Sequence, residues 1–152
     1  MFPESLRRYV LWLVGLVNER RIKEFKRTGA FTVEDFRLLS FLIDWFGKIV
    51  ATPHVLSQVS DLADLPGKEL RQMRQLFKSV VEQIEEFYET SRVLVADPAF
   101  EGHGLTDAAI ATVCSQGILV LTADVNLQLA LQRRGADALN FNHVRQLAWT
   151  QT

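Results

Sequence analysis

The sequence predicts an α/β protein with a parallel sheet and helices on both of its faces. Strand-like and helix-like segments alternate in the second half of the chain, which is the order of βαβ units. The clearest strand candidate is 118–122, where four of five residues are Ile, Leu or Val, as in a strand that is buried on both faces. Shorter strands are expected at 93–96 and 138–141. Working groups in such sheets gather at the carboxyl ends of the strands.

We expect mainly helices in the first half of the chain. Apolar residues recur every three or four positions over 36–46, and Thr32 with Asp35 forms an imperfect capping box before them. The longest amphipathic pattern begins at Pro66 and continues to Phe87. The other expected elements are a short β-like run at 48–51 and helices over 11–27, 53–62, 106–116, 124–135 and from 142 onward.

The composition limits the class of protein. A chain of 152 residues with 48% hydrophobic and 23% charged residues predicts one folded domain, residues 1–152. The single cysteine, Cys114, excludes an intrachain disulfide and a cysteine-based zinc site. No apolar run is long enough to span a bilayer and no signal peptide is recognised, so we expect a cytoplasmic protein without a membrane partner.

The charge gives no support to a strongly cationic nucleic-acid binder, because the net charge is −1. It is unevenly spread, however. Residues 1–30 hold seven bases and three acids, a net of +4, which leaves −5 for the rest. This asymmetry could steer a phosphate-bearing substrate, but a solvated helix face is the preferred interpretation.

Carboxylates are the side chains that could carry chemistry. Asp107 is expected in the first turn of a helix, where the dipole favours ionisation, and Asp124 at a strand end. Two carboxylates held close together need a cation, and Mg²⁺ or Mn²⁺ would activate water against a phosphodiester. From spacing alone, helix capping is the preferred interpretation of both residues. Asp97 also follows a predicted strand, although Asp97-Pro98 is more often a turn.

Three segments resemble the PIN-domain family. They are GLTDAAI at 104–110 followed by VLTAD at 120–124, the stretch LQLALQRRGADALNFNH at 127–143, and IVATPHVLSQV at 49–59. The resemblance covers most of the chain from about residue 10 onward. It implies a Rossmann-like three-layer α/β/α sandwich around a parallel central sheet. It also implies an acidic site that binds Mg²⁺ or Mn²⁺ and hydrolyses single-stranded RNA, as in RNA-processing nucleases and the toxins of toxin–antitoxin pairs.

The resemblance assigns roles to individual residues. Asp107 and Asp124 match the family's third and fourth acids, which are catalytic metal ligands. Thr122 matches a supporting hydrogen-bonding residue, and Asn126 lies where relatives often carry another acid. Gln58 occupies the position of the family's glutamate, and it offers a carbonyl oxygen without a charge.

The N-terminal part departs from the family, which opens with a strand ending in aspartate. Here residues 1–8 read MFPESLRR, so the first acid and the central strand are expected to be absent. Three explanations stay open at this point: residues 9–14 supply a strand, the chain starts late relative to its gene, or another copy of the chain fills the gap.

The sequence therefore supports three hypotheses. The first is a metal-dependent endoribonuclease with Asp107 and Asp124 as its remaining ligands. The second is a non-catalytic PIN-like module that binds RNA or a protein partner, such as an antitoxin. The third is an interaction protein that forms a homodimer through its helices, with Trp12, Trp45 and Trp149 at the surface.

Overall fold

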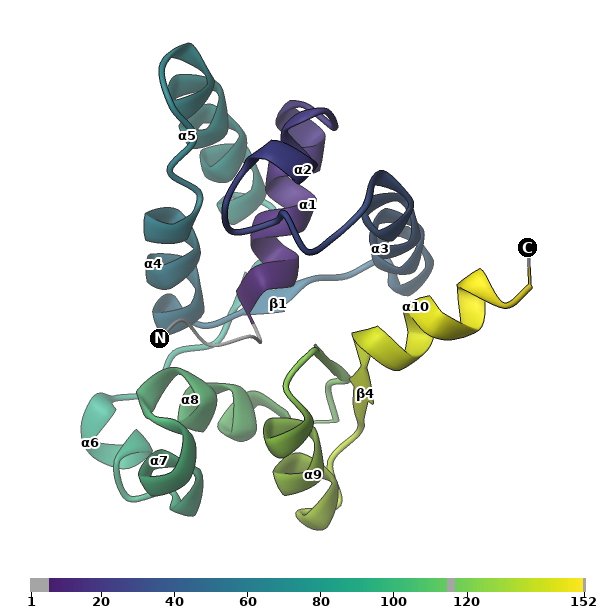
Figure 1. The fold of residues 1–152 in the computed structure, drawn as a ribbon. Helices are drawn as coiled ribbons and strands as arrows, with labels where there is room; N and C mark the ends of the chain where they lie inside the picture. The colour runs from purple at the N-terminus through teal and green to yellow at the C-terminus, as the bar shows by residue number, and fades with distance from the viewer. Residues whose placement is uncertain (1–5, 115–116, 152) are drawn as a thin grey trace. The chain divides into compact units, whose positions relative to one another are not determined.

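The computed structural model describes residues 6–114 and 117–151. Most of this part is helical, with four short strands (Figure 1). The elements in chain order are α1 (Arg7–Val17), α2 (Arg21–Glu24), α3 (Val33–Phe46), β1 (Val50–Ala51), α4 (Pro53–Leu62), α5 (Lys68–Val81), β2 (Glu85–Glu86), α6 (Ser91–Leu94), α7 (Pro98–His103), α8 (Leu105–Cys114), β3 (Val120–Thr122), α9 (Val125–Arg133), β4 (Ala138–Asn140) and α10 (Phe141–Trp149).

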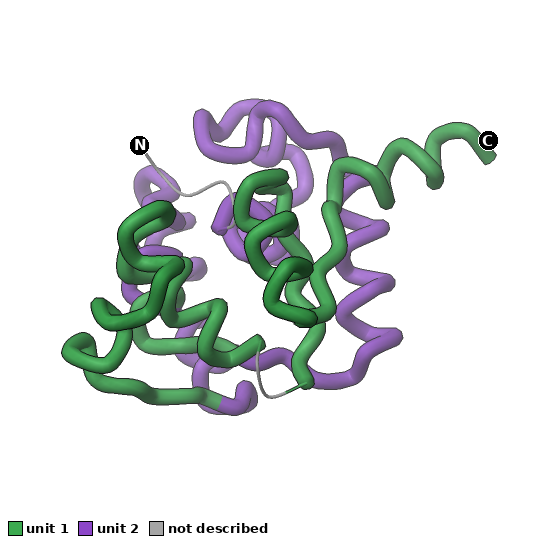
Figure 2. The backbone as a smooth tube through the Cα atoms, turned by 90° about the horizontal axis from the view of Figure 1, so that it is seen from below, with its two compact units in different colours: residues 1–5, 51–55, 86–152 green, residues 6–50, 56–85 purple. Residues whose placement is uncertain are grey.

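The chain forms two compact units (Figure 2). Among the described residues, unit 1 comprises 51–55, 86–114 and 117–151, and unit 2 comprises 6–50 and 56–85.

Unit 2 is built around α1, which contacts α2, α3 and α5. Val10, Leu11 and Val14 of α1 are fully buried, and this spacing of three to four residues puts them on the packed side of the helix. The predicted capping box of α3 is confirmed. The backbone N–H of Asp35 donates to Thr32 Oγ1 at 3.1 Å, and the backbone N–H of Thr32 donates to Asp35 Oδ2 at 2.8 Å.

Unit 1 contains a β3–α9–β4 unit, which confirms the predicted alternation in this part of the chain. The two strands pair in parallel, with Val120 opposite Ala138 and Thr122 opposite Asn140. Leu127 of α9 is completely buried at the centre of its core, packed among apolar residues of three elements. These residues are Ala111, Cys114, Leu131 and Ala138.

The structure corrects two strand predictions. Residues 93–96 were expected to form a strand, but Ser91–Leu94 is helix α6. Only Leu94 of that apolar run is buried, whereas Val93 and Val95 are about half exposed, so the segment lacks the two-sided burial of a parallel strand. The proposal that residues 9–14 supply a strand is also wrong, because they lie in α1.

Element boundaries differ in three further places. The long amphipathic helix α5 begins at Lys68 and ends at Val81, so Phe87 lies beyond it. The expected helix over 11–27 is broken into α1 and α2. The helix expected over 106–116 ends at Cys114, and Gln116 lies outside the described residues.

The sheets are smaller than the predicted central sheet. β1 pairs with β2 and β3 pairs with β4, each pair forming a two-stranded sheet. The chain is therefore a mixed helix and strand structure with small parallel sheets.

Candidate functional site

The carboxyl ends of β3 and β4 bring polar side chains together in unit 1. Thr122 and Asn140 are the last residues of the two strands, and their Cα atoms are paired. Both residues are buried, with 0% and 2% exposure. Asp124 and Asn126 follow β3 directly. We call Thr122, Asp124, Asn126 and Asn140 the carboxyl edge.

Asp124 caps helix α9. Its Oδ1 accepts hydrogen bonds from the backbone N–H groups of Asn126 at 2.8 Å and Leu127 at 3.1 Å. Thr122 Oγ1 in turn accepts from the backbone N–H of Asp124 at 3.0 Å. Thr122 thus stabilises the turn that orients the Asp124 carboxylate. One oxygen of this carboxylate accepts hydrogen bonds from N–H groups in the first turn of α9, which have no partner within the helix.

Asp107 belongs to a different part of unit 1. It lies in the first turn of α8 and is 3% exposed. Its neighbours Ala108 and Ala109 pack with Leu94 of α6 and with residues of α7. The other end of α8, at Cys114, packs on α9 and β4, and Figure 1 shows α6 and α7 beside the first end. Cys114 Sγ lies 3.4 Å from the carbonyl oxygen of Ile118 and 3.7 Å from that of Asp137, so this end of α8 contacts the residues that precede β3 and β4.

Gln58 and Asn126 complete the set of predicted residues. Gln58 lies in α4 within the stretch that belongs to unit 2, whereas the other four candidates lie in unit 1. Asn126 is exposed in the first turn of α9, where its backbone N–H is bound by Asp124.

Asn140 is a site residue that the sequence did not single out. The cap of the last helix was expected at Asn142, but Asn140 Oδ1 accepts from the Asn142 backbone N–H at 2.9 Å and caps α10. This bond fixes the orientation of the amide, since the cap requires an acceptor. Asn140 Nδ2 is then a buried donor without a partner among the described residues. The available indication was an asparagine, a common N-cap residue, near the end of the predicted strand 138–141.

The resemblance implies that Asp107 and Asp124 would bind Mg²⁺ or Mn²⁺. Such an ion binds to charged and neutral oxygens, and its affinity depends on the number of charged ligands. The carboxyl edge supplies one carboxylate, Asp124, with one hydroxyl and two amides. In the described ranges, no group of three or more His, Cys, Asp or Glu side chains could hold a metal.

Asp97, another strand-end candidate, has a structural role. Its Oδ1 accepts from the Ala99 backbone N–H at 2.8 Å at the start of α7. Arg134 donates from two nitrogens to both carboxylate oxygens, at 2.8 and 2.9 Å. The hydrogen bonds from Arg134, helped by the one from Ala99, lower the pKa of Asp97. Arg134 is thereby engaged by this ion pair.

We predict a pH-dependent contribution from this pair. Because the folded-state pKa of Asp97 is depressed, its stabilisation is complete above the unfolded value of roughly 3.9 and is lost as the pH falls through the folded value. Asp97→Asn keeps a capping oxygen and removes the charge. We expect it to cost on the order of 1 kcal/mol at pH 7, because the pair is partly exposed. Urea unfolding of the unmodified protein and Asp97→Asn should show this difference in the free energy of unfolding at pH 7 and not at pH 3. An equal difference at both pH values would contradict the prediction.

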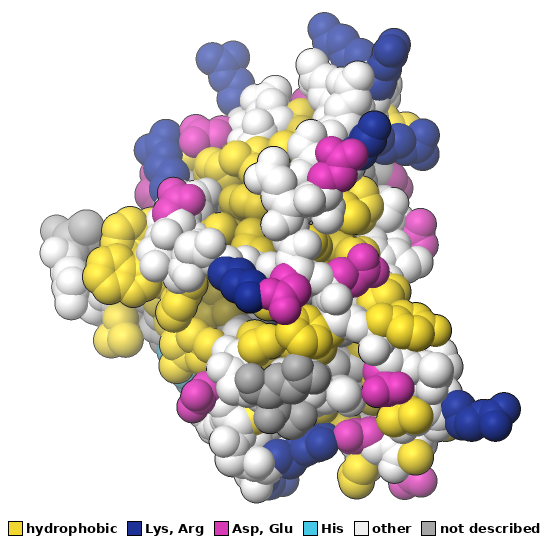
Figure 3. All heavy atoms as spheres, turned by 180° about the vertical axis from the view of Figure 1, so that it is seen from behind, with side chains coloured by type: hydrophobic (Ala, Val, Ile, Leu, Met, Phe, Trp, Pro, Cys, Tyr) yellow, Lys and Arg dark blue, Asp and Glu magenta, His cyan; other side chains and the backbone are white. Residues whose placement is uncertain are grey.

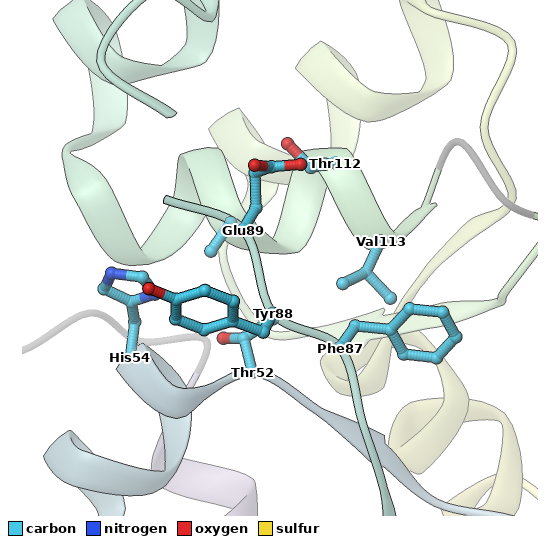
Figure 4. Close-up of a pocket in the computed structure, with 8 residues that line it drawn as sticks. Thr52, His54, Phe87, Tyr88, Glu89, Thr112 and Val113 are labelled. Atoms are coloured by element: carbon cyan, nitrogen blue, oxygen red, sulfur yellow. The ribbon is translucent and has the colours of Figure 1, made fainter. Parts of the chain in front are cut away.

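A small pocket in unit 1 is lined by residues from three segments (Figure 4). They are Thr52, His54, Phe87, Tyr88, Glu89, Ala109, Thr112 and Val113. The Tyr88 side chain extends toward His54, and Glu89 points toward Thr112. The hollow has a volume of about 40 Å³, which is room for a few water molecules only. His54 Nδ1 is buried there and has no partner in the described part of the chain.

Comparison with known proteins assigns no family. The chain matches no protein-family model, and it matches neither a curated protein nor a solved structure. None of the helices in the described ranges has both the length and the apolar character needed to cross a membrane.

Proposed function

We propose that this chain is a PIN-like module that binds RNA or a protein partner without cleaving it. The observation that supports this proposal best is that the described residues hold no group of three or more His, Cys, Asp or Glu side chains suited to bind a metal. The proposal retains the resemblance of the three sequence segments to PIN domains, together with the three-layer sandwich that it implies.

The hydrogen bonds and burial of the carboxylates also support the proposed binding function. Asp124 uses Oδ1 to satisfy two N–H groups of α9, which is the ordinary role of an N-cap aspartate. Asp107 is buried within unit 1, and Gln58 contributes no charge where the family has a glutamate. A divalent site with fewer charged ligands binds its ion more weakly. A binding role needs none of these groups to act on a metal.

A metal-dependent ribonuclease is the second candidate, and one observation favours it. Asp124 lies at the carboxyl end of a parallel strand, next to the buried Thr122 that bonds its backbone. This is where the working groups of parallel α/β sheets gather. In this candidate, Asp124 and Asp107 would be drawn to an ion of Mg²⁺ or Mn²⁺ together with the substrate.

Two substitutions of Asp124 separate the capping role from the catalytic role. Asn retains a capping oxygen and removes the charge, whereas Ala removes both. We expect Asp124→Asn to unfold at nearly the same urea concentration as the unmodified protein, and Asp124→Ala to lose about 1 kcal/mol. Binding of the partner should survive Asp124→Asn.

Cleavage assays test the proposal itself. A fluorescent single-stranded RNA is incubated with Mn²⁺ and either the unmodified protein or Asp107→Asn/Asp124→Asn. We expect intact RNA in both cases. Cleavage that is lost in the double variant and in excess chelator would establish the ribonuclease instead.

A further inference from the structure

Helix α5 of unit 2 carries a line of exposed basic side chains. Lys68, Arg71, Arg74 and Lys78 are all exposed, and they follow one another at intervals of three, three and four residues. This spacing keeps them on one side of the helix. Ten residues of helix span about 15 Å, so the line is long enough to follow several phosphates of a nucleic acid strand.

The opposite side of α5 is the packed side. Met73 is 2% exposed and Glu69 is 8% exposed, and α5 contacts α1. None of the exposed large hydrophobic residues in the described part of the chain lies on α2 or α5. The basic side is therefore not part of an amphipathic membrane-binding surface, which would expose apolar side chains beside its cations.

Helix α2 extends this charge. Arg21 Nε donates to Glu69 Oε1 at 2.7 Å, which ties α2 to α5. The exposed Arg20, Lys23 and Lys26 lie on α2 or next to it in the chain. We call these three residues and the four of α5 the basic surface. Figure 3 shows Lys and Arg side chains in dark blue at the upper end of the view, where α2 and α5 lie.

The acids around the basic surface are bound by other bases. Glu24 and Glu69 both pair with Arg21, and Asp64 pairs with Arg27. Within residues 6–114 and 117–151, the cations of the basic surface are thus left largely uncompensated, apart from a long exposed contact of 3.9 Å between Lys78 and Glu82. Such a contact contributes little in water.

The whole-chain charge conceals this distribution. Among the described residues, unit 2 has thirteen Lys and Arg and ten Asp and Glu residues, a net charge of +3, whereas unit 1 has four and seven, a net charge of −3. A polyanion would be attracted to unit 2 and repelled by unit 1.

We propose that the basic surface binds the phosphate backbone of single-stranded RNA. This inference rests on the proposed binding function and names its partner and its surface. Two arginines at the centre of the line, Arg71 and Arg74, can each donate two parallel hydrogen bonds to a phosphate. The contacts are to the backbone, so binding is expected to depend strongly on salt and weakly on sequence.

The test measures the anisotropy of fluorescein-labelled U20 RNA with the full chain in EDTA, across a series of salt concentrations. EDTA prevents metal-dependent cleavage, so the result does not depend on whether the chain is a nuclease. We expect Arg71→Glu/Arg74→Glu to weaken binding at least tenfold at low salt and to reduce the salt slope by one to two. Arg92→Glu/Arg133→Glu is the matched control, since it makes the same charge change at exposed residues of unit 1 and should have a much smaller effect.

Three results would overturn the inference. Unmodified protein that does not bind U20 at low salt would overturn it, and the proposed function would then hold only with a protein partner. Equal losses in the two double variants would show a general charge effect. Binding to phosphatidylserine vesicles in preference to RNA, lost in Arg71→Glu/Arg74→Glu, would assign the surface to membranes. Circular dichroism and thermal melts confirm that the variants are folded.

Discussion

Replacement of Leu127 by alanine is expected to lower the free energy of unfolding by about 2–5 kcal/mol. Leu127 is 0% exposed and packs at the meeting point of α8, α9 and β4. Truncation removes buried methyl groups and leaves a cavity that these elements cannot close completely. Urea unfolding followed by circular dichroism measures the loss.

The control for this prediction is on the same helix. Val125 is 50% exposed in the first turn of α9, and Val125→Ala removes methyl groups that are already in contact with water. We expect it to change the stability by less than about 0.5 kcal/mol. Equal effects of the two substitutions would mean that α9 does not pack as described.

Substitution of Gly15 by alanine is expected to destabilise unit 2 by about 1–3 kcal/mol. A Cβ at this position would lie 2.3 Å from Cδ2 of the Phe36 ring, which is far closer than van der Waals contact. The glycine allows α1 and α3 to approach each other. At an exposed helix position, the same substitution would instead stabilise the protein by about 1 kcal/mol. A loss of stability therefore indicates a close contact at Gly15, and a gain indicates that there is none.

A double-mutant cycle isolates this contact. Gly15→Ala is measured in the unmodified protein and again with Phe36→Leu, which removes the ring that the new Cβ would meet. We expect the alanine to cost much less in the second background, with a coupling energy of at least about 1 kcal/mol. The same cost in both backgrounds would show that Phe36 does not limit residue 15.

Local patterns predicted the elements that depend on local contacts. The capping box at Thr32 and Asp35 needs only four consecutive residues, and it is present in the structure. The β3–α9–β4 unit was predicted because a buried apolar run, an aspartate cap and a second short run follow in order. Each of these patterns contains its own start and stop residues.

Elements that depend on distant contacts were not predicted. The run at 93–96 has strand-like residues, but it is a helix because only Leu94 finds a buried environment. The end of α5 at Val81 was missed because the apolar spacing continues to Phe87 beyond the helix. The pairing of Arg134 with Asp97 could not be foreseen, because 37 residues separate the two positions.

The candidate site could be predicted only in part. The position of Asp124 after a strand, and its cap, follow from its neighbours. The surroundings of Asp107 depend on how α8 packs against other elements, which one sequence does not specify. The basic surface was not predicted, because an amphipathic pattern does not show which other basic residues lie beside the exposed face of α5. Its link to α2 through Arg21 and Glu69 joins residues 48 positions apart.

The most direct measurement follows one sample of unmodified protein with labelled single-stranded RNA in Mn²⁺. Anisotropy is recorded during an hour of incubation, and the RNA is then run on a denaturing gel. The account predicts a rise in anisotropy that persists and full-length RNA on the gel. A fall in anisotropy with shortened RNA, absent when Asp107→Asn/Asp124→Asn replaces the unmodified protein, would contradict it and establish a metal-dependent ribonuclease.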